Sequence, residues 1–177
     1  MNEKILIQKC HLGEPRAQRT LFDRYYGYVY KVIYRYVNHH QDTEDVASIV
    51  FNKIFKNINR VVDSRGSGLK RWIQTITINE SLRFVQKKNP VIFTDDDFIL
   101  DQTHQEEYLE ENVNVDYLNS LINEMPKGYR MIFLLNVVEG LSHSEIANHL
   151  NISKNTSKSQ LLKARKYLQS ALKTYER

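Results

Sequence analysis

The sequence predicts an all-α protein of two small helical domains joined by an acidic linker, and three observations support this fold class. Apolar residues recur at steps of three and four over most of the chain, which is the spacing of amphipathic helices. Only six Gly and three Pro occur in 177 residues, so helices are seldom interrupted. The formal charge changes sign twice along the chain and so separates two basic blocks by an acidic one.

The charge blocks indicate where the domains begin and end. Residues 1–88 hold sixteen Lys/Arg and eight Asp/Glu, a net of +8, and residues 126–177 hold nine and three, a net of +6. Residues 89–125 between them hold ten Asp/Glu and no Lys/Arg, a net of −10. This layout is typical of two nucleic-acid-binding domains and a connector, although any single block is also explained by a solvated face. We place the first domain at 1–89, the linker at 90–114 and a four-helix second domain at 115–177.

Composition and motifs argue against several classes of protein. A single cysteine, Cys10, precludes an internal disulfide or a thiolate metal cluster and suits a reducing cytoplasm. The amino-terminal residues lack the apolar run of a signal peptide, and no stretch reaches the length of a membrane span. The loop at 65–68 lacks the Lys-Ser/Thr ending of a phosphate-binding loop, and the six His are scattered. We therefore expect no cofactor, no metal site, no small-molecule substrate and no enzyme activity.

Three helices are expected in the first domain, after a short helical segment at 3–12 that Gly13 interrupts. The first carries apolar residues at helical spacing and six tyrosines, most of which should be buried or half-buried. A loop at 38–41 follows, and Asp42 is expected to cap the second helix. The core stripe of the second helix is Val46, Val50, Ile54 and Ile58.

The third helix is expected over 69–88, and it combines the only Trp with amide and cationic side chains. Such a mixture suits contact with a nucleic-acid backbone and with unstacked bases. Trp72 itself is better explained as a core anchor, so the contacts are expected from its polar and cationic neighbours. These are Lys70, Arg71, Gln74, Thr75, Asn79, Arg83, Lys87 and Lys88.

The second domain should begin with a helix from Val115 to Met125. Pro126 is expected to open the next helix as its first residue, and Gly140 to end it. Apolar residues as far as Val137 make that helix apolar on more than one side, as expected for the central helix of a small bundle.

Residues 141–168 predict a helix-turn-helix. Ser142 and Glu145 fit a capping box at the start of its first helix, and Ser153 caps the second helix after a tight turn. The packed face of the second helix is Ser157, Leu161, Ala164 and Leu168. The opposite, polar face suits a DNA major groove, although an ordinary helical hairpin with a solvated face has the same pattern. That polar face is Lys154, Asn155, Lys158, Ser159 and Leu162.

With these residues in view, the sequence resembles a bacterial RNA polymerase sigma factor of the extracytoplasmic-function group over nearly its whole length. The second domain is the stronger match: a Pro-led helix, LSHSEIANHL, and then NTSKSQLLKARKYL, which is similar to the family's TVKSR…ARKxL run. In the first domain, Asp42-Thr43-Glu44-Asp45-Val46 resembles the family's acidic start. Trp72, Ile73, Ile76 and Asn79 resemble its WLxxIxxN pattern.

The resemblance implies a cytoplasmic subunit that binds core RNA polymerase and promoter DNA. The first domain would hold the polymerase clamp helices and open the minus-ten element. The second would read the minus-thirty-five element from the duplex, and the acidic linker would enter the active-site cleft. An anti-sigma factor, membrane-bound for many relatives, is a further partner that the resemblance implies.

Carried over position by position, the resemblance implies three sets of contact residues. For the minus-thirty-five element they are Lys154, Asn155, Thr156, Lys158, Ser159, Leu162 and Lys163. For the minus-ten element they are Gln74, Thr75, Asn79 and Arg83, with the cations Lys70, Arg71, Lys87 and Lys88 beside them. For the polymerase they are Asp45, Ser48, Ile49 and Lys53.

Some positions depart from the family pattern. Ser48 and Ile49 stand where the family has Gln-Glu, Arg83 where it often has Asp, and Ser157 where its recognition helix has an apolar residue. We interpret these departures as divergence in promoter choice. A second interpretation of the whole chain is a stand-alone helix-turn-helix regulator whose first domain senses a ligand or a partner. Core polymerase distinguishes the two, because a sigma factor binds promoter DNA poorly alone and a regulator binds its operator directly.

Overall fold

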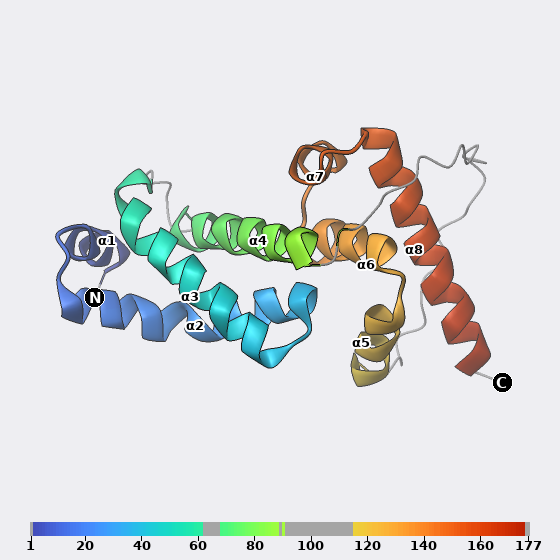
Figure 1. Cartoon of the computed structure of the whole chain (residues 1–177), viewed down its shortest axis with the longest axis horizontal. Helices are drawn as coiled ribbons and strands as arrows, with labels where there is room; N and C mark the ends of the chain where they lie inside the picture. The colour runs from blue at the N-terminus through green and yellow to red at the C-terminus, as the bar shows by residue number, and fades with distance from the viewer. Residues whose placement is uncertain (1, 62–67, 89, 91–114, 176–177) are drawn as a thin grey trace. The chain divides into compact units, whose positions relative to one another are not determined.

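The structure, a computed structural model, describes residues 2–61, 68–88, 90 and 115–175, and every regular element within them is a helix. The chain divides into two compact units, Met1–Pro90 and Val91–Arg177, which are described separately below (Figure 1). The predicted all-α class with two helical domains is confirmed. Apart from Pro90, the linker expected at 90–114 lies outside the described residues. None of the helices in the described part of the chain is both long and apolar enough to cross a membrane.

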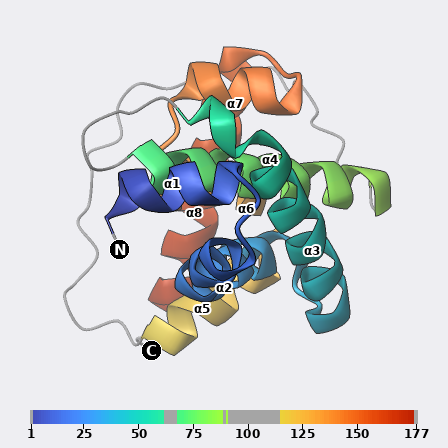
Figure 2. The same ribbon diagram turned by 90° about the vertical axis from the view of Figure 1, so that its left-hand side faces the viewer.

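The first unit is a bundle of three long helices with a short helix against one end. Each of α2, α3 and α4 packs against the other two, and Figure 2 shows α2 nearly end-on with α3 beside it. The elements are α1 (Glu3–His11), α2 (Pro15–Val37), α3 (His40–Asn57), the 3-10 turn η1 (Ile58–Arg60) and α4 (Gly68–Lys88).

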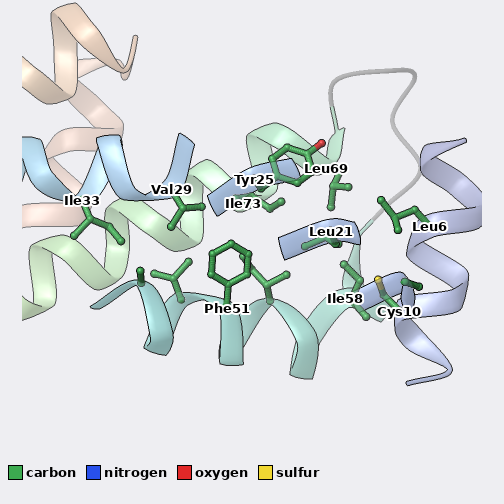
Figure 3. Packing of buried hydrophobic residues seen from close by; sticks show 14 of the residues in the cluster. Leu6, Cys10, Leu21, Tyr25, Val29, Ile33, Phe51, Ile58, Leu69 and Ile73 are labelled. Carbon is green, nitrogen blue, oxygen red and sulfur yellow. The ribbon is translucent and has the colours of Figure 1, made fainter. Parts of the chain in front are cut away.

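One apolar core joins these helices, and Figure 3 shows its side chains from α1, α2, α3 and α4 converging. The predicted stripe of α3 is confirmed, because Val46, Val50, Ile54 and Ile58 are each at most 1% exposed. Burial of one such side chain contributes roughly 1.5–3 kcal/mol, so this stripe is a main source of stability. The tyrosines of α2 also follow the prediction: two are buried and four are half-buried.

The connection between α2 and α3 is shorter than the sequence suggested. Asn38, in the left-handed conformation at φ 52°, ends α2, and α3 begins two residues later at His40. The cap of α3 is His39, whose Nδ1 accepts a hydrogen bond from the Asp42 amide at 3.4 Å. The expectation that Asp42 caps this helix was therefore wrong, because α3 begins at His40 and Asp42 lies within its first turn. The Asp42 carboxylate pairs with Lys88 of α4, 46 residues away in the sequence.

The second unit is built around the long helix α8. Its core contains Leu121 and Met125, and Ala164, Leu168 and Leu172 of α8 pack against them. The elements are α5 (Val115–Glu124), α6 (Lys127–Phe133), the π-helical turn η2 (Leu134–Val138), α7 (His143–Leu150) and α8 (Lys154–Tyr175).

Two details of the central helix differ from the prediction. Pro126 is the cap of α6 and not its first residue, since its ψ of 137° is extended. Beyond Phe133 the helix widens into the π-helical turn, in which the Glu139 amide bonds the Leu134 carbonyl at 3.0 Å. Val137, one of the apolar residues by which the helix was expected to be apolar on more than one side, lies within this turn and is 48% exposed. Gly140 follows at φ +74°, where the helix ends as predicted.

Candidate nucleic-acid interface

Local side-chain hydrogen bonds build the helix-turn-helix formed by α7 and α8. Ser142 Oγ accepts from the Glu145 amide at 3.3 Å, and Glu145 Oε2 accepts from the Ser142 amide at 2.8 Å, so the predicted capping box is confirmed. Asn151, at φ 55°, ends α7. Ser153 Oγ then accepts from the Thr156 amide at 2.9 Å and caps α8, as expected. These bonds satisfy amides that a helix start leaves unpaired, and so they define where α7 and α8 begin.

The packed face of α8 is also the predicted one. Ser157, Leu161, Ala164 and Leu168 are all buried. The Ser157 hydroxyl lies 2.9 Å from His143 Nδ1, so the small polar residue in this core position joins α8 to the start of α7. Burial lowers the pKa of His143 below its usual value, and the cations Lys158, Lys154 and Arg165 lower it further. The imidazole is therefore held in its neutral form near pH 7.

The front of α8 is only partly as expected. Lys154, Asn155 and Lys158 are exposed, and Leu162 and Lys163 are partly exposed. Thr156 and Ser159, expected to face DNA, are buried instead, at 3% and 9% exposed. Their short side chains form hydrogen bonds near the start of α8: the Thr156 hydroxyl lies 2.7 Å from Ser153 Oγ, and the Ser159 hydroxyl donates to the Thr156 carbonyl at 3.0 Å. The surface that α8 offers is therefore narrower and more cationic than predicted.

In the first unit, four of the eight expected minus-ten residues form one exposed stripe along α4. Arg71, Thr75, Asn79 and Arg83 are all exposed and are spaced at steps of four, which places them on one side of the helix. Their order is guanidinium, hydroxyl, amide and guanidinium. The stripe covers about 18 Å of helix, from a rise of about 1.5 Å per residue.

Of the other four expected residues, Lys87 continues the stripe at the next step of four, and the remaining three do not join it. The ammonium group of Lys70 lies 5.2 Å from the centre of the Tyr28 ring of α2. Lys88 forms the ion pair with Asp42 of α3, while Lys87 is exposed and Gln74 is half-buried. Trp72 is half-buried and packs against the apolar core, as its interpretation as an anchor requires.

The expected polymerase-binding residues of α3 divide in a similar way. Asp45, Ser48 and Ile49 are exposed, and Ile49 is a large apolar side chain that is 45% exposed. Lys53 is different, because its ammonium group bonds Glu80 Oε1 of α4 at 2.6 Å. Glu80, whose side chain is 9% exposed, also has the Arg83 guanidinium 3.9 Å away.

Sequence reasoning missed two residues that organise these surfaces. Glu80 joins α3 to α4 through Lys53, and His143 joins α7 to α8 through Ser157. The pairs are 27 and 14 residues apart in the sequence. A lone Glu on the apolar side of a helix is the only signal that could have indicated the first pair, since buried carboxylates are almost always paired. Among the residues that the structure describes, no three His, Cys, Asp or Glu are grouped as metal ligands.

Comparisons with known proteins agree with this geometry. Residues 21–90 match sigma-70 region 2, and residues 116–168 match sigma-70 region 4. The chain is 25% identical to the Bacillus subtilis extracytoplasmic-function (ECF) RNA polymerase sigma factor SigW over 179 residues, which covers 94% of this chain and 95% of SigW.

Two solved structures have a similar fold. CnrH in complex with the cytosolic domain of CnrY has a TM-score of 0.53 at 17% identity, with 97% of each chain covered. The sigma factor RpoE of Bartonella quintana, in complex with the anti-sigma factor NepR, has a TM-score of 0.52 at 21% identity, with 88% of this chain and 96% of RpoE covered.

The chain therefore belongs to the sigma factors of bacterial RNA polymerase, the initiation factors that carry sigma-70 regions 2 and 4. Within that class it is a sigma factor of the ECF type.

Proposed function

We propose that the two units divide promoter recognition between them. The first unit binds the polymerase through the exposed face of α3 and holds the opened minus-ten element on α4. The second unit reads the minus-thirty-five duplex with the front of α8. The chain performs this task as a binding subunit without a reaction of its own, in the cytoplasm where polymerase and promoter meet.

The α4 stripe of Arg71, Thr75, Asn79 and Arg83 is the observation that carries the minus-ten assignment. Guanidinium groups at its two ends suit phosphates, and the hydroxyl and amide between them suit the edges of bases. Bases that have left the duplex expose such edges and can be held individually. Capture of an unstacked base offsets the few kcal/mol that unstacking costs, so a surface of this kind assists strand opening.

For the minus-thirty-five element, the front of α8 supplies Lys154, Lys158 and Lys163 for phosphates and Asn155 for a base edge. Amide side chains pair with adenine in the major groove, and Lys side chains contact either phosphates or guanine. The buried Thr156 and Ser159 are left out of this assignment. The neutral His143 leaves the cationic charge of this surface to the lysines and to Arg165.

At the polymerase interface, Asp45, Ser48 and Ile49 are the contact residues. Ile49 supplies an apolar anchor of the kind that dominates binding energy in interfaces. Ser48 Oγ donates to the Glu44 carbonyl at 3.0 Å, so this side chain contributes little polarity of its own. Lys53 is left out as a direct contact, because its charge is already paired with Glu80.

An anti-sigma factor is a further partner. Two proteins with a similar fold are seen in complexes, CnrH with the cytosolic domain of CnrY and the sigma factor RpoE with the anti-sigma factor NepR. We propose that the present chain is likewise bound by an anti-sigma factor, either soluble or membrane-bound.

The deciding experiment combines a pull-down with core RNA polymerase of the same host and run-off transcription on genomic fragments. Stoichiometric binding and new, discrete start sites are expected. Arg71→Ala and Asn79→Ala should reduce open-complex formation and leave polymerase binding unchanged, with Arg19→Ala on α2, outside the α4 stripe and the exposed face of α3, as the control. Tight duplex binding by the chain alone, with no binding to core polymerase, would refute the proposal.

A further inference from the structure

A second row of exposed cations lies on α2, a helix to which the proposed function gives no role. Arg16, Thr20, Arg24, Gly27, Lys31 and Arg35 follow one another at steps of four, four, three, four and four, which keeps them on one side of a helix. All are exposed except Thr20, which is half-buried. We call these six residues the α2 stripe. It lies opposite the buried side of the helix that contains Leu21 and Val29.

The net charge of this side of α2 is positive. The helix α2 carries five Lys/Arg and a single acidic residue, Asp23. Asp23 lies beside the stripe, three residues after Thr20 and four before Gly27, and pairs with Arg19 at 3.0 Å. This pair neutralises the only carboxylate of α2, so the side of the helix that carries the stripe has a net positive charge. Lys70 of α4, over the Tyr28 ring, adds a positive charge from the neighbouring helix.

Gly27 in the middle of the stripe has no structural explanation. It lies within a 23-residue helix, where Gly costs about 0.5–1 kcal/mol relative to Ala. A Cβ atom built on it would meet nothing within 4 Å, and its φ is not positive. Neither packing nor backbone conformation therefore requires Gly here. A side chain missing from an exposed, cationic surface allows another backbone to approach the helix closely.

The shape of the α2 stripe suits an extended polyanion. From Arg16 to Arg35 the rise is about 28 Å, from about 1.5 Å per residue. Lys31 and Arg35 are about 6 Å apart along the axis, which is close to the spacing of successive phosphates on one DNA strand. A compact anion would engage only one or two of these cations, whereas a phosphodiester backbone can run past all of them.

A protein partner fits this surface less well. Protein interfaces depend on apolar or aromatic anchors near their centre. At the centre of the α2 stripe is a Gly, and no side chain of α2 is among the large hydrophobic residues found exposed in the described part of the chain. Contacts with a nucleic-acid backbone need no such anchor, because the release of counterions by Lys and Arg supplies their free energy.

We infer that the α2 stripe is a second DNA-binding surface, on which Arg16, Arg24, Lys31 and Arg35 contact the sugar-phosphate backbone of promoter DNA and Gly27 lets that backbone lie against the helix. This inference rests on the proposed function, since promoter DNA reaches the α2 stripe only in the complex with polymerase. It contributes affinity and not sequence preference, because phosphates are the same at every position.

The first test uses Gly27→Ala and Gly27→Gln in the full chain. Both substitutions remove a Gly from the interior of a helix, so the Tm of the free protein should rise, by about 2–8 °C for Gly27→Ala. Each variant is then assembled into holoenzyme with host core polymerase, and its affinity is measured for a fluorescein-labelled duplex of a promoter that run-off transcription has identified. This affinity should fall relative to the wild type, and more for Gly27→Gln than for Gly27→Ala. If a substitution raises the stability of the protein and still lowers its affinity for DNA, the loss of affinity cannot come from impaired folding and reports on contact with DNA. Unchanged affinity for both variants would overturn the inference.

The second test measures the salt dependence of the same complex. Arg24→Gln with Lys31→Gln removes two phosphate contacts, so the slope of log K against log salt should fall by about 1.8 in magnitude. The affinity advantage of the wild type should then shrink roughly tenfold between 50 and 200 mM salt. Arg19→Gln is the matched control, because Arg19 lies on the same helix, outside the stripe, and is already paired with Asp23.

The outcomes distinguish this inference from the function beneath it. A wild-type chain that binds no polymerase and directs no start sites would refute the proposed function. A wild-type chain that is active, with an unchanged slope for Arg24→Gln/Lys31→Gln, would refute only the α2 stripe. Weakened polymerase binding with an unchanged slope would also refute it, and would assign the cations to an acidic protein surface.

Discussion

The pair between Lys53 and Glu80 predicts an unequal response to removal of its two members. The ammonium and carboxylate are 2.6 Å apart, but the Lys53 side chain is 38% exposed and the Glu80 side chain only 9%. Lys53→Met leaves a nearly buried carboxylate whose only other cation in the described contacts, Arg83, is 3.9 Å away. Glu80→Gln leaves an ammonium group that water already reaches.

The magnitudes follow from this difference in exposure. Loss of one partner from a fully buried pair costs about 3–5 kcal/mol, and an exposed pair contributes about 0–1 kcal/mol. For Lys53→Met we expect a loss of about 2 kcal/mol, between these limits, because the carboxylate side is the buried one. For Glu80→Gln we expect about 1 kcal/mol or less. In a unit of this size the first loss corresponds to a decrease in Tm of roughly 8–16 °C.

Urea unfolding followed by Trp72 fluorescence measures this directly. Trp72 is the only Trp of the chain and packs against the core of the first unit, so its signal reports on that unit. Lys56→Met on the exposed side of α3 is the matched control and should change stability by no more than about 0.5 kcal/mol. Equal losses for Lys53→Met and Glu80→Gln, or a loss for Lys56→Met as large as that for Lys53→Met, would refute the reasoning.

Three further predictions concern the helix-turn-helix. Ser142→Ala removes the cap of α7 and should destabilise the second unit by about 1 kcal/mol in urea unfolding followed by circular dichroism. The pKa of His143 is lowered in the folded state, so below about pH 6.5 the unfolded state binds more protons than the folded state. The contribution of His143 to the free energy of unfolding should be complete above that pH and should be lost as the pH decreases. His143→Gln should flatten this pH dependence of stability. Lys158→Ala should weaken minus-thirty-five binding on all sequences and reduce the salt slope by about 1, measured by fluorescence anisotropy with the holoenzyme.

Each of these expectations has a result that contradicts it. Ser142→Ala with wild-type stability would show that the remaining contacts position α7 without the cap. A pH profile of stability that His143→Gln leaves unchanged would assign the dependence to another group. A Lys158→Ala protein with an unchanged salt slope would show that this side chain does not meet a phosphate.

Much of the fold followed from the sequence because it depends on neighbours within one helical turn. The capping box of Ser142 and Glu145 and the cap by Ser153 involve residues three apart, so the pattern of residue types is sufficient to predict them. The packed faces of α3 and α8 follow from helical periodicity. The extent of α4, expected over 69–88 and observed at Gly68–Lys88, belongs to the same category.

The tertiary structure decided which of the expected contact residues remain accessible. Lys53 and Lys88 are drawn into pairs with Glu80 and Asp42, which are 27 and 46 residues away in the sequence. Periodicity assigns a residue to a side of its own helix but does not indicate which charge the neighbouring helix presents. The π-helical turn that contains the exposed Val137 is likewise not indicated by helical periodicity, which assumes a regular α-helix.

The sequence by itself determined the class of this protein, its two helical units and the local signals that begin and end its helices, because these depend on residue type and short spacing. Only the tertiary structure decided which cations are free to meet DNA and which hold the bundle together. The physical reason is that charges far apart in the chain compete for the same partners, and the outcome depends on how the helices pack.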